Sequence, residues 1–201
     1  MSTLFAASPV VAGDPLRPAR AFLTALCVLW TATAPAHGAC TDLAAPGVDW
    51  RRCRLDGAAL DGVDLSGARI TDAWFQRAQL RGARLVGVDG RRARFISADL
   101  RGTIFDRSDL VGADFTNADL RGASLKQTDL RRARLFRADL RDADLSGANL
   151  EGADLLHAEL AGARWIDGTS ICAPDSIGRC HPLPPSGDAR TTPPPSPLVR
   201  D

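Results

Sequence analysis

Signatures of catalysis are scarce in this chain. Its three histidines, His37, His157 and His181, are too far apart to give the ligand spacing of a zinc site. Ser66 and Ser146 have no identifiable His and Asp partners for nucleophilic catalysis. The glycines recur at fixed intervals and form no phosphate-binding loop. We therefore expect a protein that is not an enzyme and that has no catalytic residue, no bound metal and no cofactor.

The chain also lacks a charge imbalance and a long hydrophobic run. Its 25 Lys and Arg residues nearly balance its 24 Asp and Glu residues, so no strong field attracts nucleic acid or an acidic membrane surface. The apolar run at residues 21–30 is too short for a membrane span, which needs about 20 residues. The composition predicts no nucleic-acid partner and no stable membrane insertion.

What the chain does have is a repeat of five residues. A large apolar residue, which is Leu, Ile, Phe or Trp, stands at every fifth position from Trp50 to Trp165, and Gly90 is the one exception. Two residues before each of these positions lies a small side chain, which is Ala in 17 of the 24 units and Val, Cys, Thr or Ser in the other seven. Residues 48–167 therefore form a single array.

The period of five restricts the secondary structure. On an α-helix, positions five apart are offset by roughly 140°, so the large residues would surround the helix and leave no apolar face. On a straight strand, an odd period sends successive large residues to opposite faces. A chain that bends once per unit instead returns each large residue and its small companion to one interior. The period therefore predicts a stacked solenoid.

Residues 118–122 (Ala-Asp-Leu-Arg-Gly) and 148–152 (Ala-Asn-Leu-Glu-Gly) resemble the A-(D/N)-L-x-x unit of pentapeptide-repeat proteins. The resemblance extends over the whole array. It implies an all-β fold, a right-handed quadrilateral β-helix in which four units make one coil and the large and small residues both point inward. The 24 units would then make about six coils.

With four units in each coil, residues 20 apart stack directly. Phe75 and Phe95 then lie in successive coils of one column. In another column, Gly90 leaves a side chain missing between Ile70 and Leu110. We expect the bulk of the two Phe side chains to fill this gap, because an empty cavity in a core is costly. The alternative is a local bulge with a looser core.

One outer face carries two parallel rows of opposite charge. The first row is mostly acidic and comprises Gln79, Asp99, Asp119, Asp139 and Glu159, while the second comprises Arg81, Arg101, Arg121 and Arg141. Like charges about 4.8 Å apart repel by roughly 0.9 kcal/mol in water, and the neighbouring row can offset this repulsion. We expect the two rows to neutralise each other. The alternative is that the arginines bind an anionic polymer.

Phe136 and Leu156 stack in one outward column near the C-terminal end of the array. Outward apolar residues that gather in one place indicate a covered or binding surface. We expect the terminal segment to cover them. The alternative is a contact between two copies of the chain, which would make a homodimer through an end of the solenoid.

The segments outside the array divide into a signal peptide, two caps and a tail. Residues 1–38 place arginines before a short apolar run and a small-residue stretch, which is typical of a signal peptide. Residues 39–47 would cap the N-terminal end. Residues 168–180 break the register and resemble the C-terminal cap of secreted bacterial pentapeptide-repeat proteins. Residues 181–201, with seven Pro, are expected to be a disordered tail. We predict a periplasmic or secreted bacterial protein.

Removal of the signal peptide would discard Cys27 and leave four cysteines, an even number in an oxidising compartment. Four cysteines allow three connectivities, and proximity in the sequence favours one disulfide near each end of the array. These pairs are Cys40 with Cys53 and Cys172 with Cys180. Each closed loop would contribute roughly 3 kcal/mol, and the ends are where a solenoid needs protection from further strand pairing.

Two functional hypotheses remain. The first is a scaffold or binding module outside the cytoplasm, with a protein or a glycan as its unidentified partner. The second follows from the resemblance, because pentapeptide-repeat rods that imitate DNA bind DNA gyrase. Such mimicry requires a strongly acidic surface, whereas residues 48–167 carry 19 acidic and 20 basic side chains. The near-neutral charge and the signal peptide both disfavour the second hypothesis.

Overall fold

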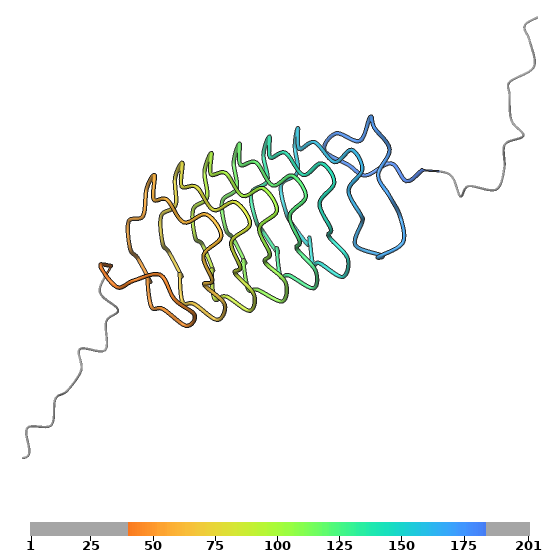
Figure 1. The fold of residues 1–201 in the computed structure, drawn as a ribbon. Helices are drawn as coiled ribbons and strands as arrows, with labels where there is room; N and C mark the ends of the chain where they lie inside the picture. Colours follow the sequence, from red (N-terminus) through yellow and green to blue (C-terminus); the bar gives the residue numbers. More distant parts are fainter. Residues whose placement is uncertain (1–39, 184–201) are drawn as a thin grey trace, which may run out of the picture. The chain divides into compact units, whose positions relative to one another are not determined.

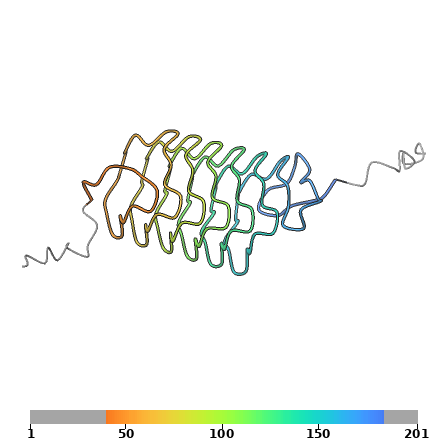
Figure 2. The ribbon, with the colours of Figure 1, turned by 60° about the horizontal axis from the view of Figure 1, so that its bottom comes forward.

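The computed structural model describes residues 40–183, which form a stack of coils along one axis (Figure 1). The coils repeat side by side when the molecule is turned (Figure 2). The predicted signal peptide and most of the predicted tail lie outside the described residues. Among those described, no helix is long and apolar enough to cross a membrane.

The chain pairs with itself every 20 residues. Parallel bridges join residues 20 apart, beginning with Asp49 and Arg69 and ending with Asp144 and Arg164. Within residues 40–183 there is no helix and no strand longer than one bridging residue, because each unit contributes only the residue before its large side chain to the pairing. Four units thus complete one turn, and the array is a four-sided solenoid.

At nearly every corner of a coil there is a tight turn in which the carbonyl of the large residue accepts a hydrogen bond from the amide three residues later. In one example, the carbonyl of Leu120 accepts a hydrogen bond of 3.0 Å from the amide of Ala123. Gly122, the third residue of this four-residue turn, has a φ of 64°, which is the left-handed value that a type II turn requires at that position. The same positive φ recurs at every fifth position from Gly47 to Gly162, and half of these positions are not glycine.

Backbone hydrogen bonds between coils hold the stack together. The amide of Leu120 donates to the carbonyl of Asp139 at 2.8 Å, and the amide of Asp119 donates to the carbonyl of Ala98 at 3.0 Å. The first bond runs to the next coil and the second to the preceding one. Because buried amides must find partners, this pattern explains how a chain without long strands remains ordered.

The interior is filled by the large and small positions of the repeat. Phe75, Phe95 and Phe115 stack in successive coils, with ring centroids 5.1 and 5.0 Å apart and planes 7° from parallel. This arrangement confirms that residues 20 apart share a column. Phe105, from a neighbouring column, contacts Phe95 edge-on at 5.7 Å. Both geometries are favourable for aromatic rings.

The small interior positions tolerate three hydroxyl groups because each one is satisfied. Thr103, Ser108 and Thr128 are at most 2% exposed. Their hydroxyls donate to main-chain carbonyls of the preceding coil at 2.7, 2.6 and 2.9 Å. A buried hydroxyl without such a partner would be costly, so these residues replace Ala without weakening the core.

The gap at Gly90 is closed differently from our expectation. A Cβ atom at this position would lie 2.7 Å from Cδ2 of Leu110 and 3.5 Å from Cδ1 of Ile70. These are the nearest atoms, so the two neighbours in the same column close the space, and the prediction that Phe75 and Phe95 fill it is wrong. The rings are held instead in their own column, where they stack on each other.

The two ends of the array are closed by disulfides. Cys40 is bonded to Cys53, and Cys172 is bonded to Cys180, which is the connectivity that sequence proximity favours. At the C-terminal end the chain reverses direction and pairs antiparallel with the last coil. Two bridges join Glu159 with Ile177 and Arg164 with Ile171, and a third, between Cys172 and Pro182, lies within the terminal segment itself.

Candidate functional site

The charged side chains of the array lie on its outer sides. Among residues 40–183 no three His, Cys, Asp or Glu side chains lie close enough together to hold a metal ion. The hydroxyl of Ser146 donates to Asp144, and His157 packs edge-on against Phe136 at 5.8 Å. The charged and apolar surfaces of the array are its candidate functional sites.

The two charged rows predicted from the sequence form one ion-pair ladder, which comprises Arg81, Asp99, Arg101, Asp119, Arg121, Asp139, Arg141 and Glu159. From Arg101 onward, each arginine pairs with the acidic residue two positions before it and with an acidic residue of the next coil. Arg101, for example, lies 2.8 Å from Asp99 and 3.6 Å from Asp119. Arg81 lacks an acidic residue in its own coil and pairs with Asp99 at 2.6 Å.

The ladder changes the acidity of its carboxyl groups. The hydrogen bond from Arg101 lowers the pKa of Asp99 to about 2. The hydrogen bond from Arg121 likewise lowers the pKa of Asp119. Because every arginine of the ladder already has a carboxylate partner, the geometry favours mutual neutralisation, and a role for these arginines in binding an anionic polymer stays a prediction.

The outward apolar pair is only partly covered. Phe136 is half-buried, with the guanidinium of Arg137 5.0 Å from its ring centroid. Leu156 is 57% exposed. The described part of the terminal segment, which ends at Leu183, thus does not cover Leu156, while residues 184–201 lie outside the described residues.

The backbone beside Leu156 is an open edge. The cap forms backbone hydrogen bonds with the last coil only from residue 158 onward, where the amide of Gly178 donates to the carbonyl of Ala158 at 2.8 Å. Gly178 also packs against the end of this edge, since a Cβ atom on it would lie 3.4 Å from the carbonyl oxygen of Leu155. Four amides of the same coil make no backbone hydrogen bond within residues 40–183, namely those of Leu150, Gly152, Leu155 and His157. Edges of this kind accept a further strand. We call residues 150–157 the open edge.

A second arginine-rich region escaped the sequence analysis. The pattern Arg-Arg-x-Arg occurs three times at intervals of 40 residues, which is two coils. The three triplets are Arg51, Arg52 and Arg54; Arg91, Arg92 and Arg94; and Arg131, Arg132 and Arg134. We call them the basic edge. A search for pairs of coils, rather than for single coils, would have found this signal.

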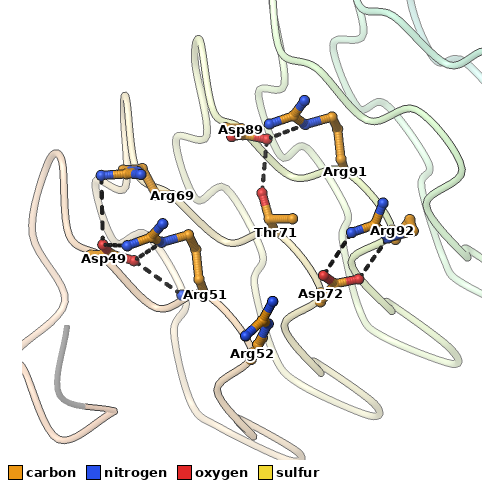
Figure 3. Close-up of a pocket in the computed structure, with 9 residues that line it drawn as sticks. All are labelled: Asp49, Arg51, Arg52, Arg69, Thr71, Asp72, Asp89, Arg91 and Arg92. Atoms are coloured by element: carbon orange, nitrogen blue, oxygen red, sulfur yellow. Dashed lines mark hydrogen bonds and ion pairs between the residues drawn. The ribbon is translucent and has the colours of Figure 1, made fainter. Parts of the chain in front are cut away.

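A run of grooves follows the basic edge. The first has a volume of about 310 Å³ and is lined by nine residues that include Arg52, Asp72 and Arg92 (Figure 3). The second has a volume of about 660 Å³, shares those three residues and extends to Arg132. A third, of about 310 Å³, includes Arg132 and Gly152. The shared residues make these grooves continuous along the solenoid.

Most arginines of the first groove are already engaged. Asp72 accepts two hydrogen bonds of 2.8 Å from Arg92, and these bonds lower the pKa of Asp72. Arg91 pairs with Asp89 at 3.0 Å. In contrast, the side chain of Arg52 has no marked interaction in Figure 3, and no ion pair joins it to any residue of the described range.

In the second groove, an aromatic ring holds arginines in place. Arg54 and Arg94 lie over the ring of Trp74, with guanidinium carbons 4.9 and 4.3 Å from its centroid. The three residues belong to successive coils. A cation over an indole ring is attracted without losing its charge, so Trp74 orders these side chains and leaves them positive.

Comparison with known proteins identifies the repeat. The model for pentapeptide repeats matches in eight copies, at residues 44–72, 73–110, 105–135 and 133–164. A search of curated proteins found no match. Solved structures that match include HetL, a pentapeptide repeat protein involved in heterocyst differentiation regulation from the cyanobacterium Nostoc. HetL is 27% identical, with 61% of this chain and 78% of HetL covered and a TM-score of 0.31.

Two further structures are more distant. One is a pentapeptide repeat protein from the thylakoid lumen of Arabidopsis thaliana, which is 23% identical, with 65% of this chain and 86% of that chain covered and a TM-score of 0.30. The other is QnrB1, a plasmid-mediated fluoroquinolone resistance protein, which is 19% identical, with 59% and 65% covered and a TM-score of 0.28.

Proposed function

The chain belongs to the pentapeptide-repeat family, and we propose that it is a non-enzymatic binding module that acts outside the cytoplasm, built as a right-handed solenoid of six coils. The observation that supports this location is the pair of disulfides, one near each end of the array. Disulfides persist in oxidising compartments and are rare in the cytosol. The alternative, an intracellular protein that binds gyrase, would have to maintain both bonds in a reducing environment.

A reporter fusion tests the location. The full chain is fused to alkaline phosphatase, which requires an oxidising compartment, and in parallel to a fluorescent protein that folds only in the cytoplasm. We expect activity from the phosphatase fusion, and loss of that activity when residues 1–38 are deleted. A signal from the cytoplasmic reporter alone would overturn the proposed location and favour the intracellular alternative.

We propose that a protein contact forms at the open edge, with a second copy of the chain as the partner. Two copies related by a twofold axis could pair their open edges antiparallel, and this would give partners to the free amides of Leu150 and Gly152 on each side. Leu156 lies on this edge and is 57% exposed, so the same contact would remove an apolar side chain from water.

Light scattering tests the contact. The wild-type protein is expected to be dimeric, and Leu156→Lys is expected to be monomeric because a buried, unpaired ammonium would oppose the contact. Leu43→Lys is the matched control, since Leu43 is 89% exposed at the other end. A wild-type protein that remains monomeric over the accessible concentration range would overturn the dimer and leave the proposed location untouched.

A further inference from the structure

We propose that the basic edge binds an acidic polysaccharide whose acid groups are widely spaced, such as one with a single carboxylate in each disaccharide. The proposal rests on the proposed function, because it names a ligand for a binding module outside the cytoplasm. It concerns a surface that is distinct from the ion-pair ladder and that reaches the open edge only in the third groove, at Glu151 and Gly152. Each triplet would hold one acid group of the polymer.

Every triplet keeps one exposed arginine without a carboxylate partner. In the described range, no Asp or Glu oxygen lies within 4.0 Å of the side-chain nitrogens of Arg52, Arg94 or Arg132. The other arginines of the edge do pair, as Arg134 does with Asp114 at 3.4 Å. The unpaired guanidinium groups can therefore offer two parallel N–H donors to an incoming carboxylate.

The sign and the spacing of the charges along the basic edge favour a polyanion whose acid groups are far apart. Triplets lie two coils apart, which is about 9.6 Å from the spacing of paired strands. The coils between them present carboxylates to the same groove, namely Asp72 and Asp114. A polymer with an acid group every two coils meets only arginines. A nucleic acid carries a phosphate about every 3.4 Å along each strand, so some phosphates would face these aspartates.

The groove also lacks a platform for bases. Its aromatic residue is Trp74, and the guanidinium groups of Arg54 and Arg94 lie over its ring. Single-stranded nucleic acids are held by bases that stack on exposed aromatic faces, and this ring is already engaged. Small residues open the groove instead, since Gly112 lines the second hollow and Gly152 the third.

Three of these arginines adopt a conformation that suits glycine better. Arg52, Arg92 and Arg132 have φ values of 62°, 55° and 57°, at the turn position where half of the units carry Gly. A left-handed conformation is unfavourable for a side chain with a Cβ. Arg52 and Arg132 form no ion pair within the described residues, so their guanidinium groups stay available to a ligand of the groove.

The same conformation gives a test that leaves the fold intact. The triple variant Arg52→Gly, Arg92→Gly, Arg132→Gly places the preferred residue at each turn. Binding of the full chain to hyaluronate, measured by isothermal titration, is expected to weaken by roughly tenfold or more, because the unpaired Arg52 and Arg132 are lost and the loss of Arg92 leaves Asp72 without its partner in the groove. Circular dichroism melts would show that the variant remains folded.

The matched control is Arg77→Gly, Arg107→Gly, Arg137→Gly. These arginines have φ values of 57°, 59° and 56° and lie at the same turn position, but none of them lines the first two grooves. The control has the same net charge as the test variant. We expect it to bind hyaluronate like the wild type, whereas equal weakening in both variants would reduce the effect to overall charge and overturn the proposal.

Competition separates the polysaccharide from other polyanions. Single-stranded DNA and vesicles of phosphatidylglycerol are added to the hyaluronate complex at equal charge concentration, and neither is expected to displace it. Displacement by either one would overturn the assignment to a polysaccharide. Absence of hyaluronate binding by the wild type would overturn the inference, while the location and the dimer contact would still be judged by their own experiments.

Discussion

Two arginine-rich regions of this solenoid use the same repeat unit with opposite results. In the ion-pair ladder, an acidic residue stands in every coil from Asp99 to Glu159, so arginines lie between carboxylates above and below. Along the basic edge, arginine triplets alternate with coils that hold aspartates, and each triplet keeps one unpaired member. The period of the acidic residues therefore decides whether arginine stabilises the rod or remains available to a ligand.

The two regions differ in arginine pairing because of the distance between an arginine and the nearest carboxylates. Neighbouring coils are about 4.8 Å apart, which one arginine can span, as Arg121 does between Asp119 and Asp139 at 2.6 and 3.5 Å. When the acidic positions alternate with triplets, there are more guanidinium groups than carboxylates within reach. A solenoid of near-neutral net charge can thus carry a positive edge, because neutrality of the whole does not imply neutrality of each column.

The largest expected difference between the two regions is the loss of stability when one carboxylate of each is neutralised. Asp99→Asn removes the partner of both Arg81 and Arg101 and should lower the free energy of unfolding by about 1.5 kcal/mol. Asp72→Asn removes the partner of exposed Arg92 and should cost no more than about 0.5 kcal/mol. Urea denaturation at pH 7 measures both values. Equal losses would show that the ladder is no more stabilising than the basic edge.

The loss caused by Asp99→Asn should depend on pH. The pKa of Asp99 is lowered from 3.8 to about 2 in the folded protein, so its contribution to stability is present above pH 4 and is lost as the pH falls toward 2. The wild type and the variant are therefore expected to converge in thermal stability near pH 2. Melting curves at intervals between pH 6 and pH 2 give the comparison, and a constant difference would contradict the predicted linkage.

Removing the aspartates of the basic edge should strengthen binding. The double variant Asp72→Asn, Asp114→Asn takes two negative charges from the groove, and we expect hyaluronate to bind roughly threefold more tightly, which is about 0.6 kcal/mol. Single-stranded DNA should gain more than hyaluronate, because its closely spaced phosphates would no longer face carboxylates. The measurement is titration of each polymer, and Asp99→Asn serves as the charge control from the ladder.

The smallest expected effect has opposite signs in the two regions. Arg132→Gly should raise the free energy of unfolding by about 0.5 kcal/mol, because it relieves a left-handed conformation. Arg121→Ala, in the ladder, should lower it by a similar amount, since two ion pairs are lost. Denaturation of the two single variants side by side provides the test, and destabilisation by Arg132→Gly would mean that its side chain has a structural role.

Much of the fold could be predicted from the sequence. The five-residue period excluded helices and flat sheets, and the columns of 20 placed Phe75, Phe95 and Phe115 on one another. The four cysteines outside the predicted signal peptide suggested the disulfides near both ends. These features are predictable because a repeat gives the same backbone direction to equivalent residues, so the interior position of one unit fixes that of the others.

Details that depend on side-chain reach could not be predicted in this way. The space beside Gly90 is closed by Leu110 and Ile70, because aliphatic side chains of the same column can extend toward a missing neighbour, whereas the stacked Phe rings stay in their own column. Similarly, the sequence placed Leu156 on the outside, but the path of the cap was needed to show that the edge beside it lacks a backbone partner.

The sequence by itself determined the period and the inward and outward positions. Only the tertiary structure decided which arginines are neutralised and which remain unpaired. The physical reason is that the period fixes where each Cβ points, while an ion pair forms only when the ends of two flexible side chains meet across neighbouring coils. Arg101 in the ladder meets both Asp99 and Asp119, whereas Arg52 in the groove meets no carboxylate among the described residues.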